Sequence, residues 1–127
     1  MFVHGLGEHS GRNLNLAVNF CDMGFETHLI DLTGFGFSFG ERAMASQKEL
    51  FEDIVLAMRE ISTDMPCFLV GHSMGGGSIL AFLRLNPNLN LAGVICSNPF
   101  IDYHKKEHVS DFEKTLIMWL PKKVLVR

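Results

Sequence analysis

One pentapeptide in the sequence has the residue types and the spacing of a catalytic nucleophile. Residues 71–75 read Gly-His-Ser-Met-Gly, the G-x-S-x-G pattern that places a serine, here Ser73, on a sharp turn between a strand and a helix. Both glycines are needed because a Cβ at either position would collide with the neighbouring backbone. The pattern lies between an apolar run and a helical pattern, which is the context it requires, so we predict that Ser73 is a nucleophile.

A second glycine-containing segment, at residues 4–7, could complete the chemistry of such a serine. It reads His-Gly-Leu-Gly. Attack of a hydroxyl on a carbonyl creates an oxyanion, which needs two backbone N–H donors. One donor belongs to the residue after the serine and the other to an earlier loop, which assigns these roles to Met74 and Leu6. Taken alone, the tetrapeptide is also consistent with an ordinary glycine turn.

Several histidines are candidates for the general base that a serine hydroxyl needs. His72 is adjacent to the serine, but its side chain points away from the hydroxyl on any sharp turn, which favours a structural role. His104 and His108 are spaced i, i+4, and Asp102 and Asp111 lie near them. These residues could hold a metal ion or form a replacement triad, although the charged residues between them are more typical of a solvated surface. We therefore predict neither a metal site nor a cofactor.

Around these residues, strand and helix patterns alternate. Apolar residues at helical spacing predict a helix from Leu14 that Gly24 ends, and a second helix behind a capping box of Ser46 and Glu49. Further patterns predict strands at residues 27–31, 67–70 and 91–96, a glycine-rich loop at 34–40 and a helix at 73–85. The apolar face of the first helix is predicted to consist of Leu14, Ala17, Val18 and Cys21. Such alternation implies right-handed crossovers, so the fold class is α/β with a parallel sheet.

Composition excludes several classes of protein. Lys and Arg number 11 against 14 Asp and Glu, and the resulting net charge of −3 argues against a nucleic-acid partner. With 47% hydrophobic residues in 127, the chain is not intrinsically disordered. Neither a secretory signal nor an apolar run of membrane-spanning length is visible, so we expect an intracellular protein, cytoplasmic or peripheral to a membrane. The three cysteines are interpreted as reduced core thiols.

Four stretches of the sequence together indicate a protein family more specifically than G-x-S-x-G does alone. They are HGLGEHSGR at residues 4–12, the pattern D-x-x-G-x-G-x-S at 31–38, GHSMGG at 71–76 and SNPF at 97–100. With them the sequence resembles the monoacylglycerol lipase-like serine hydrolases (the serine aminopeptidase S33 group) of the α/β-hydrolase fold. The resemblance implies hydrolysis of a carboxylic ester, with a lipid acyl group favoured over a peptide.

The resemblance also implies that the α/β-hydrolase core is incomplete. Residues 1–102 would form a partial core that carries the nucleophile, and residues 103–127 the start of a helical lid. The family's first strands, and the half after the lid that supplies the triad Asp and His, have no counterpart here. We expect the 127-residue chain alone to be inactive, with its base and acid supplied by further sequence or by another chain. The alternative is a catalytically inactive, hydrolase-derived structural subunit of a larger assembly.

Glu8, His9 and Arg12 belong to the first of the four stretches, in a loop that lines the polar end of the pocket in the resembled family. Contact with substrate is one interpretation of these residues. A helix-capping cluster in which Glu8 pairs with Arg12 is the other. A dinucleotide site is disfavoured because the next glycine after Gly5-x-Gly7 and after Gly34-x-Gly36 comes one residue too late for G-x-G-x-x-G.

The end of the chain has its own amphipathic pattern. Ser110 and Glu113 form a second capping box. The apolar face behind it consists of Phe112, Leu116, Trp119 and Leu120. This helix could pack on the core, or it could act as a lid that meets a lipid substrate or a membrane surface. The expected partners are therefore a lipid ester and another polypeptide that covers the incomplete fold.

Overall fold

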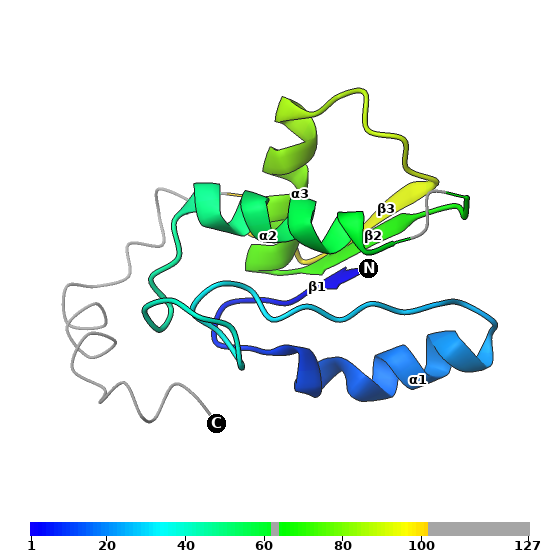
Figure 1. The fold of residues 1–127 in the computed structure, drawn as a ribbon, viewed down its shortest axis with the longest axis horizontal. Coiled ribbons are helices and arrows are strands. Elements are labelled where there is room, and N and C mark those ends of the chain that lie inside the picture. Colours follow the sequence, from blue (N-terminus) through cyan, green and yellow to red (C-terminus); the bar gives the residue numbers. More distant parts are fainter. Residues whose placement is uncertain (62–63, 102–127) are drawn as a thin grey trace.

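A small parallel sheet forms the centre of the molecule (Figure 1). The structure is a computed structural model, and it describes residues 1–61 and 64–101. The strands are β1 (Phe2–Val3), β2 (Phe68–His72) and β3 (Gly93–Ser97), in the order β1-β2-β3. Both pairings are parallel, so the loops that follow the strands gather at one edge of the sheet. The α/β class predicted from the sequence is confirmed.

β2 is the central strand, and its residues alternate between the two faces of the sheet. Val70 is paired with Phe2 on one side and with Ile95 on the other. Residues paired in this way share a face, so these three side chains point to the same side. Leu69 and Gly71 point to the opposite side, where both are buried.

Helices cover the two faces unequally. α2 (Gln47–Arg59) and α3 (Met74–Leu85) lie on one side, and α1 (Leu14–Asp22), preceded by the short 3-10 helix η1 (Ser10–Asn13), lies on the other (Figure 1). The buried apolar side chains form one cluster between the sheet and α2 and α3. Its members are Met1, Val3, Leu32, Phe35, Leu50, Ile54, Leu69, Ile79 and Phe82.

Two helix ends follow the sequence signals. The hydroxyl of Ser46 accepts a hydrogen bond from the N–H of Glu49, whose carboxylate in turn accepts from the N–H of Ser46, so the predicted capping box is confirmed. Gly24 has a φ angle of 88° and ends α1 as predicted. Beyond it, the N–H of Phe25 donates to the carbonyl of Phe20 at 3.0 Å, and the two rings make an edge contact, as in a Schellman motif.

The predicted strand at residues 27–31 is wrong as a full strand. Only Leu29 bridges to Phe2, in parallel, and the N–H of Phe2 donates to the carbonyl of His28 at 2.8 Å. β1 is itself only two residues long, and of these only Phe2 pairs with this segment. The other predicted strands and the helix at residues 73–85 are present, with their bounds shifted by one or two residues.

The predicted apolar face of α1 is also wrong. Leu14 and Val18 are more than half exposed, and Cys21 is exposed rather than a core thiol. Leu16, Ala17 and Phe20 line a pocket against the sheet, so of the predicted face only Ala17 is placed correctly. The i, i+3, i+4 spacing identifies the helix correctly, but two apolar stripes run along it and spacing does not say which one is buried.

The predictions for residues 102–127, including the lid and its apolar face, lie outside the described residues. Within the described part of the chain, none of the helices has both the length and the apolar character needed to cross a bilayer.

Candidate active site

Ser73 occupies the turn between β2 and α3 in a conformation that serine rarely adopts. Its φ angle is 50° and its ψ angle is −117°. Such backbone geometry costs about 1–3 kcal/mol and persists only where surrounding contacts hold it. Those contacts come from the end of β3: the N–H of Ser73 donates to Ser97 at 3.0 Å, and its carbonyl accepts from the N–H of Phe100 at 2.8 Å.

The glycines of the motif allow three backbone segments to meet at this turn. A Cβ on Gly71 would lie 2.7 Å from the nitrogen of Gly76, in the first turn of α3. A Cβ on Gly75 would overlap the carbonyl oxygens of Val3 and His4, where β1 ends. The predicted requirement for glycine at both motif positions therefore has a specific cause: α3 begins in direct backbone contact with β1 and β2.

The segment after β1 lies against the turn that carries Ser73. A Cβ on Gly5 would lie only 3.2 Å from the Cβ of Ser73. The N–H groups of Leu6 and Met74 have no hydrogen-bond partner in a turn, loop or cap of the described residues. The structure therefore places Gly5, the residue before Leu6, against Ser73, and Met74 follows Ser73 directly.

His4 fixes the orientation of the peptide that carries the Leu6 N–H. Its side chain is fully buried, with Nδ1 2.8 Å from the carbonyl oxygen of Gly5 and Nε2 accepting from the N–H of Leu32 at 3.1 Å. These partners require a neutral ring with its proton on Nδ1. Since C=O and N–H point in opposite directions across a trans peptide, the Leu6 N–H points away from the His4 ring and the core.

The neutral state of His4 also follows from its surroundings. Burial penalises the charged ring and lowers the pKa of His4, and this effect outweighs the Gly5 carbonyl and the nearby carboxylates. No role for His4 was predicted from the sequence. Its position before Gly5 in the H-G-x-G pattern was the available signal, but its partner Leu32 is brought to it only by the fold.

Glu8 connects the Leu6 segment to the strand that precedes Ser73. Its Oε2 accepts from the N–H of Gly5 at 2.9 Å and lies 3.5 Å from Nδ1 of His72. Burial raises the pKa of Glu8, but the Gly5 N–H and His72 together outweigh burial and lower it. His72 thus has a structural partner that the sequence did not reveal.

Arg12 and His9 are the other residues predicted to contact substrate. Arg12 is exposed in η1, and no ion pair joins it to Glu8 within the described residues. His9 is half-buried beside Gly11. The replacement base candidates His104 and His108 lie outside the described residues. Among residues 1–61 and 64–101, no three histidine, cysteine or acidic side chains come together as a metal site would require.

Asp31 joins two of the loops at this edge of the sheet. One carboxylate oxygen accepts from the N–H of Ser10 at 2.7 Å, and the other accepts from the N–H of Phe37 at 2.9 Å. Burial raises the pKa of Asp31, but these two hydrogen bonds more than compensate and lower it. The D-x-x-G-x-G-x-S pattern therefore marks a clamp between loops, with Gly36 packed directly on the carboxylate.

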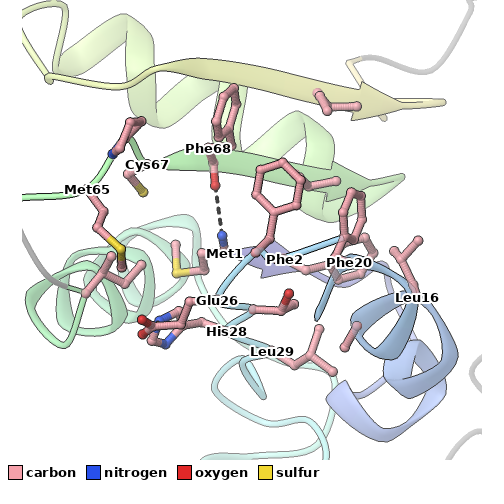
Figure 2. A pocket seen from close by; sticks show the side chains of 18 residues that line it. Met1, Phe2, Leu16, Phe20, Glu26, His28, Leu29, Met65, Cys67 and Phe68 are labelled. Atoms are coloured by element: carbon pink, nitrogen blue, oxygen red, sulfur yellow. Dashed lines mark hydrogen bonds and ion pairs between the residues drawn. The ribbon is translucent and has the colours of Figure 1, made fainter. Parts of the chain in front are cut away.

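An apolar pocket of about 390 Å³ lies at the opposite edge of the sheet (Figure 2). It is bounded by α1 and by the start of β1 and β2, including Phe2, Phe20 and Phe68. None of Ser73, Leu6 and Met74 lines it. Its apolar lining is typical of a ligand site, but the strained turn at Ser73 and the polar groups around it lie elsewhere.

Comparison with known proteins agrees with this geometry. The sequence model of the serine aminopeptidase S33 family matches residues 1–127. The chain belongs to this family. It is 34% identical over 102 residues to the monoglyceride lipase of Homo sapiens, covering 77% of this chain and 33% of that protein. It is 39% identical over 99 residues to the monoglyceride lipase homolog of Monkeypox virus, covering 74% and 36%.

Solved structures place this S33-family chain in the α/β-hydrolase fold. The crystal structure of Paleococcus ferrophilus monoacylglycerol lipase superimposes with a TM-score of 0.74 at 31% identity, covering 92% of this chain and 44% of that one. The fold and the family resemblance predicted from the sequence are therefore confirmed. The chain spans about a third of the length of the two curated relatives.

Proposed function

We propose that the protein acts as a serine hydrolase of carboxylic esters, similar to monoacylglycerol lipases and lysophospholipases, with Ser73 as its nucleophile. The observation that carries the proposal is the backbone of Ser73, held at a φ angle of 50° between a strand and a glycine-rich helix with Gly5 packed against it. The relatives named as monoglyceride lipases support a lipid ester as substrate.

In the proposed reaction, Oγ of Ser73 attacks the ester carbonyl while a base takes its proton. The N–H groups of Leu6 and Met74 stabilise the negative charge on the carbonyl oxygen. The C–O bond to the alcohol then breaks, the alcohol leaves with the proton, and water hydrolyses the acyl-enzyme. Glu8 acts by holding Gly5 and His72 in place, whereas His9 and Arg12 remain available for contact with substrate.

The general base is the missing part of this proposal. Within the described residues, the Ser73 hydroxyl has no hydrogen bond to a histidine, and His72 faces Glu8. We propose that a histidine and its orienting acid come from sequence outside this chain. In the alternative, an inactive structural subunit of a larger assembly, no base is supplied to Ser73.

A chimera tests the role of Ser73. Residues 1–101 replace the matching segment of human monoglyceride lipase, which contributes the rest of its own chain. We expect this chimera to react with a fluorophosphonate probe at Ser73 and to hydrolyse a monoacylglycerol, and we expect Ser73→Ala to abolish both. Ser97→Ala is the matched control, because Ser97 contacts Ser73 through its backbone carbonyl. A folded chimera that is inert would contradict the proposal and favour the structural subunit.

The 127-residue chain alone should label weakly with the same probe, and strong labelling there would point to His104 or His108 as the base.

Substitution of Gly7 tests the oxyanion loop in the same chimera. Gly7 has a φ angle of 72°, which a β-branched side chain strongly disfavours. Gly7→Val should therefore shift the Leu6 N–H and lower kcat about 10²-fold, the typical effect of losing one oxyanion donor. The measurement is steady-state hydrolysis, with folding checked by circular dichroism. Unchanged kcat would mean that the Leu6 N–H does not contact the oxyanion.

A further inference from the structure

Phe37 and Phe39 stand out among the apolar side chains of residues 1–61 and 64–101. They are 97% and 96% exposed, whereas Phe35 in the same glycine-rich loop is buried against the ring of His4. Residues 34–40, called the aromatic loop below, contain no charged side chain. Single exposed apolar residues are common on protein surfaces, but two almost fully exposed rings two residues apart form an unusual apolar projection.

The backbone of the aromatic loop is held firmly, so the exposure of the two rings is built into the fold. The N–H of Phe37 donates to the Asp31 carboxylate at 2.9 Å. The carbonyl of Phe39 accepts from the N–H of Gly34 at 2.7 Å, and the Arg42 guanidinium donates to the carbonyl of Gly36 at 2.9 Å.

The aromatic loop projects from the same edge of the sheet as Ser73. It follows the segment that bridges to β1 in parallel, so it leaves the sheet at the carboxyl ends of the strands. Asp31 and Leu32, which precede it, are hydrogen-bonded to Ser10 and to His4 in the segment after β1. The two rings are therefore coupled through short, direct contacts to the loop that carries Leu6.

We propose that the aromatic loop docks the protein on a lipid surface by inserting Phe37 and Phe39, an inference whose choice of partner rests on the proposed lipid-ester function. Aromatic side chains on an uncharged, projecting loop can enter the boundary between headgroups and acyl chains. The charges that follow the loop, on Glu41 and Arg42, balance each other, and the whole chain carries −3. Docking is therefore driven by apolar burial and does not depend on anionic lipid. It places Ser73 at the edge that faces the lipid.

Vesicle sedimentation tests this proposal on the Ser73→Ala chain, which cannot turn over lipid through Ser73. The chain should partition onto phosphatidylcholine vesicles, equally well at low and high salt. F37S/F39S should lower the partition coefficient about 10²-fold, about tenfold for each ring withdrawn from the bilayer. F37L/F39L should restore most of the binding. Addition of phosphatidylserine to the vesicles should not raise the affinity.

The matched control removes two exposed apolar side chains from the opposite edge. Met23 ends α1 and Leu85 ends α3, and they are 71% and 68% exposed. M23S/L85S should bind as the parent chain does, and circular dichroism should show that both double variants are folded. The proposal is overturned if the parent chain stays in the supernatant, if F37S/F39S binds normally, or if M23S/L85S loses as much binding. Because binding is measured without Ser73, failed probe labelling of the chimera would count against the proposed reaction and not against the docking surface.

Discussion

Replacing Gly75 by alanine should destabilise the protein by at least about 3 kcal/mol, the upper end of what overpacking costs. The added Cβ would overlap the carbonyl oxygens of Val3 and His4. A side chain could rotate away from such a clash, but these carbonyls belong to the end of β1 and cannot move without breaking the sheet. Since small domains have only about 5–15 kcal/mol of stability, this loss would remove a large share of it and lower the urea midpoint clearly.

Urea unfolding followed by circular dichroism measures this effect. Gly11→Ala is the matched control, because its Cβ would meet only the end of the His9 ring at 3.0 Å, which can move on the surface. It should change the free energy of unfolding by less than about 0.5 kcal/mol. Equal stability of Gly75→Ala and the parent chain would mean that α3 and β1 are not in backbone contact.

Replacing His4 by leucine should cost roughly 2–6 kcal/mol, because it leaves the Leu32 N–H without its acceptor and the Gly5 carbonyl without the ring N–H donor. Each buried polar group that loses its partner costs about 1–3 kcal/mol. His28→Leu is the control, since the side chain of His28 pairs with Glu26 at the surface and its loss should cost less than about 1 kcal/mol. If the two variants were equally stable, the His4 hydrogen bonds would contribute nothing.

His4 should also make the free energy of unfolding depend on pH. Because the folded state lowers the pKa of His4, the neutral ring stabilises the fold fully above the ordinary histidine pKa of about 6.5. That contribution is lost as the pH falls below about 6.5 toward the folded-state pKa. The urea midpoint should therefore decrease between about pH 7.5 and 5.5, a range in which Glu8 and Asp31 stay ionised. His4→Gln should show a smaller decrease, and an identical profile would exclude His4 as the source.

Local signals in the sequence predicted the parts of the fold that short-range interactions determine. The capping box of Ser46 and Glu49 and the left-handed Gly24 involve residues within one turn of each other, so their spacing is sufficient. The turn at Ser73 is local in part: a Cβ on Gly71 would meet the start of α3, whereas a Cβ on Gly75 would meet the distant end of β1.

Features that depend on distant segments could not be predicted in this way. The buried face of α1 depends on where Phe2 and Phe68 lie, and the single bridge at Leu29 depends on where Phe2 lies. His4 reaches Leu32, 28 residues away, and only the folded chain brings them together. For the site, the residue types were predictable, whereas the partners that orient them were not.

The parallel pairing of β1 with β2 has a consequence for the order of folding. It joins segments far apart in the chain, and the amino group of Met1 donates to the carbonyl of Phe68 across 67 positions. β2, α3 and β3 lie within residues 68–97 and close much shorter loops, so they can assemble first at lower entropic cost. The N-terminal segment would then dock late. A nascent chain would thus complete the turn at Ser73 before the Leu6 segment arrives beside it.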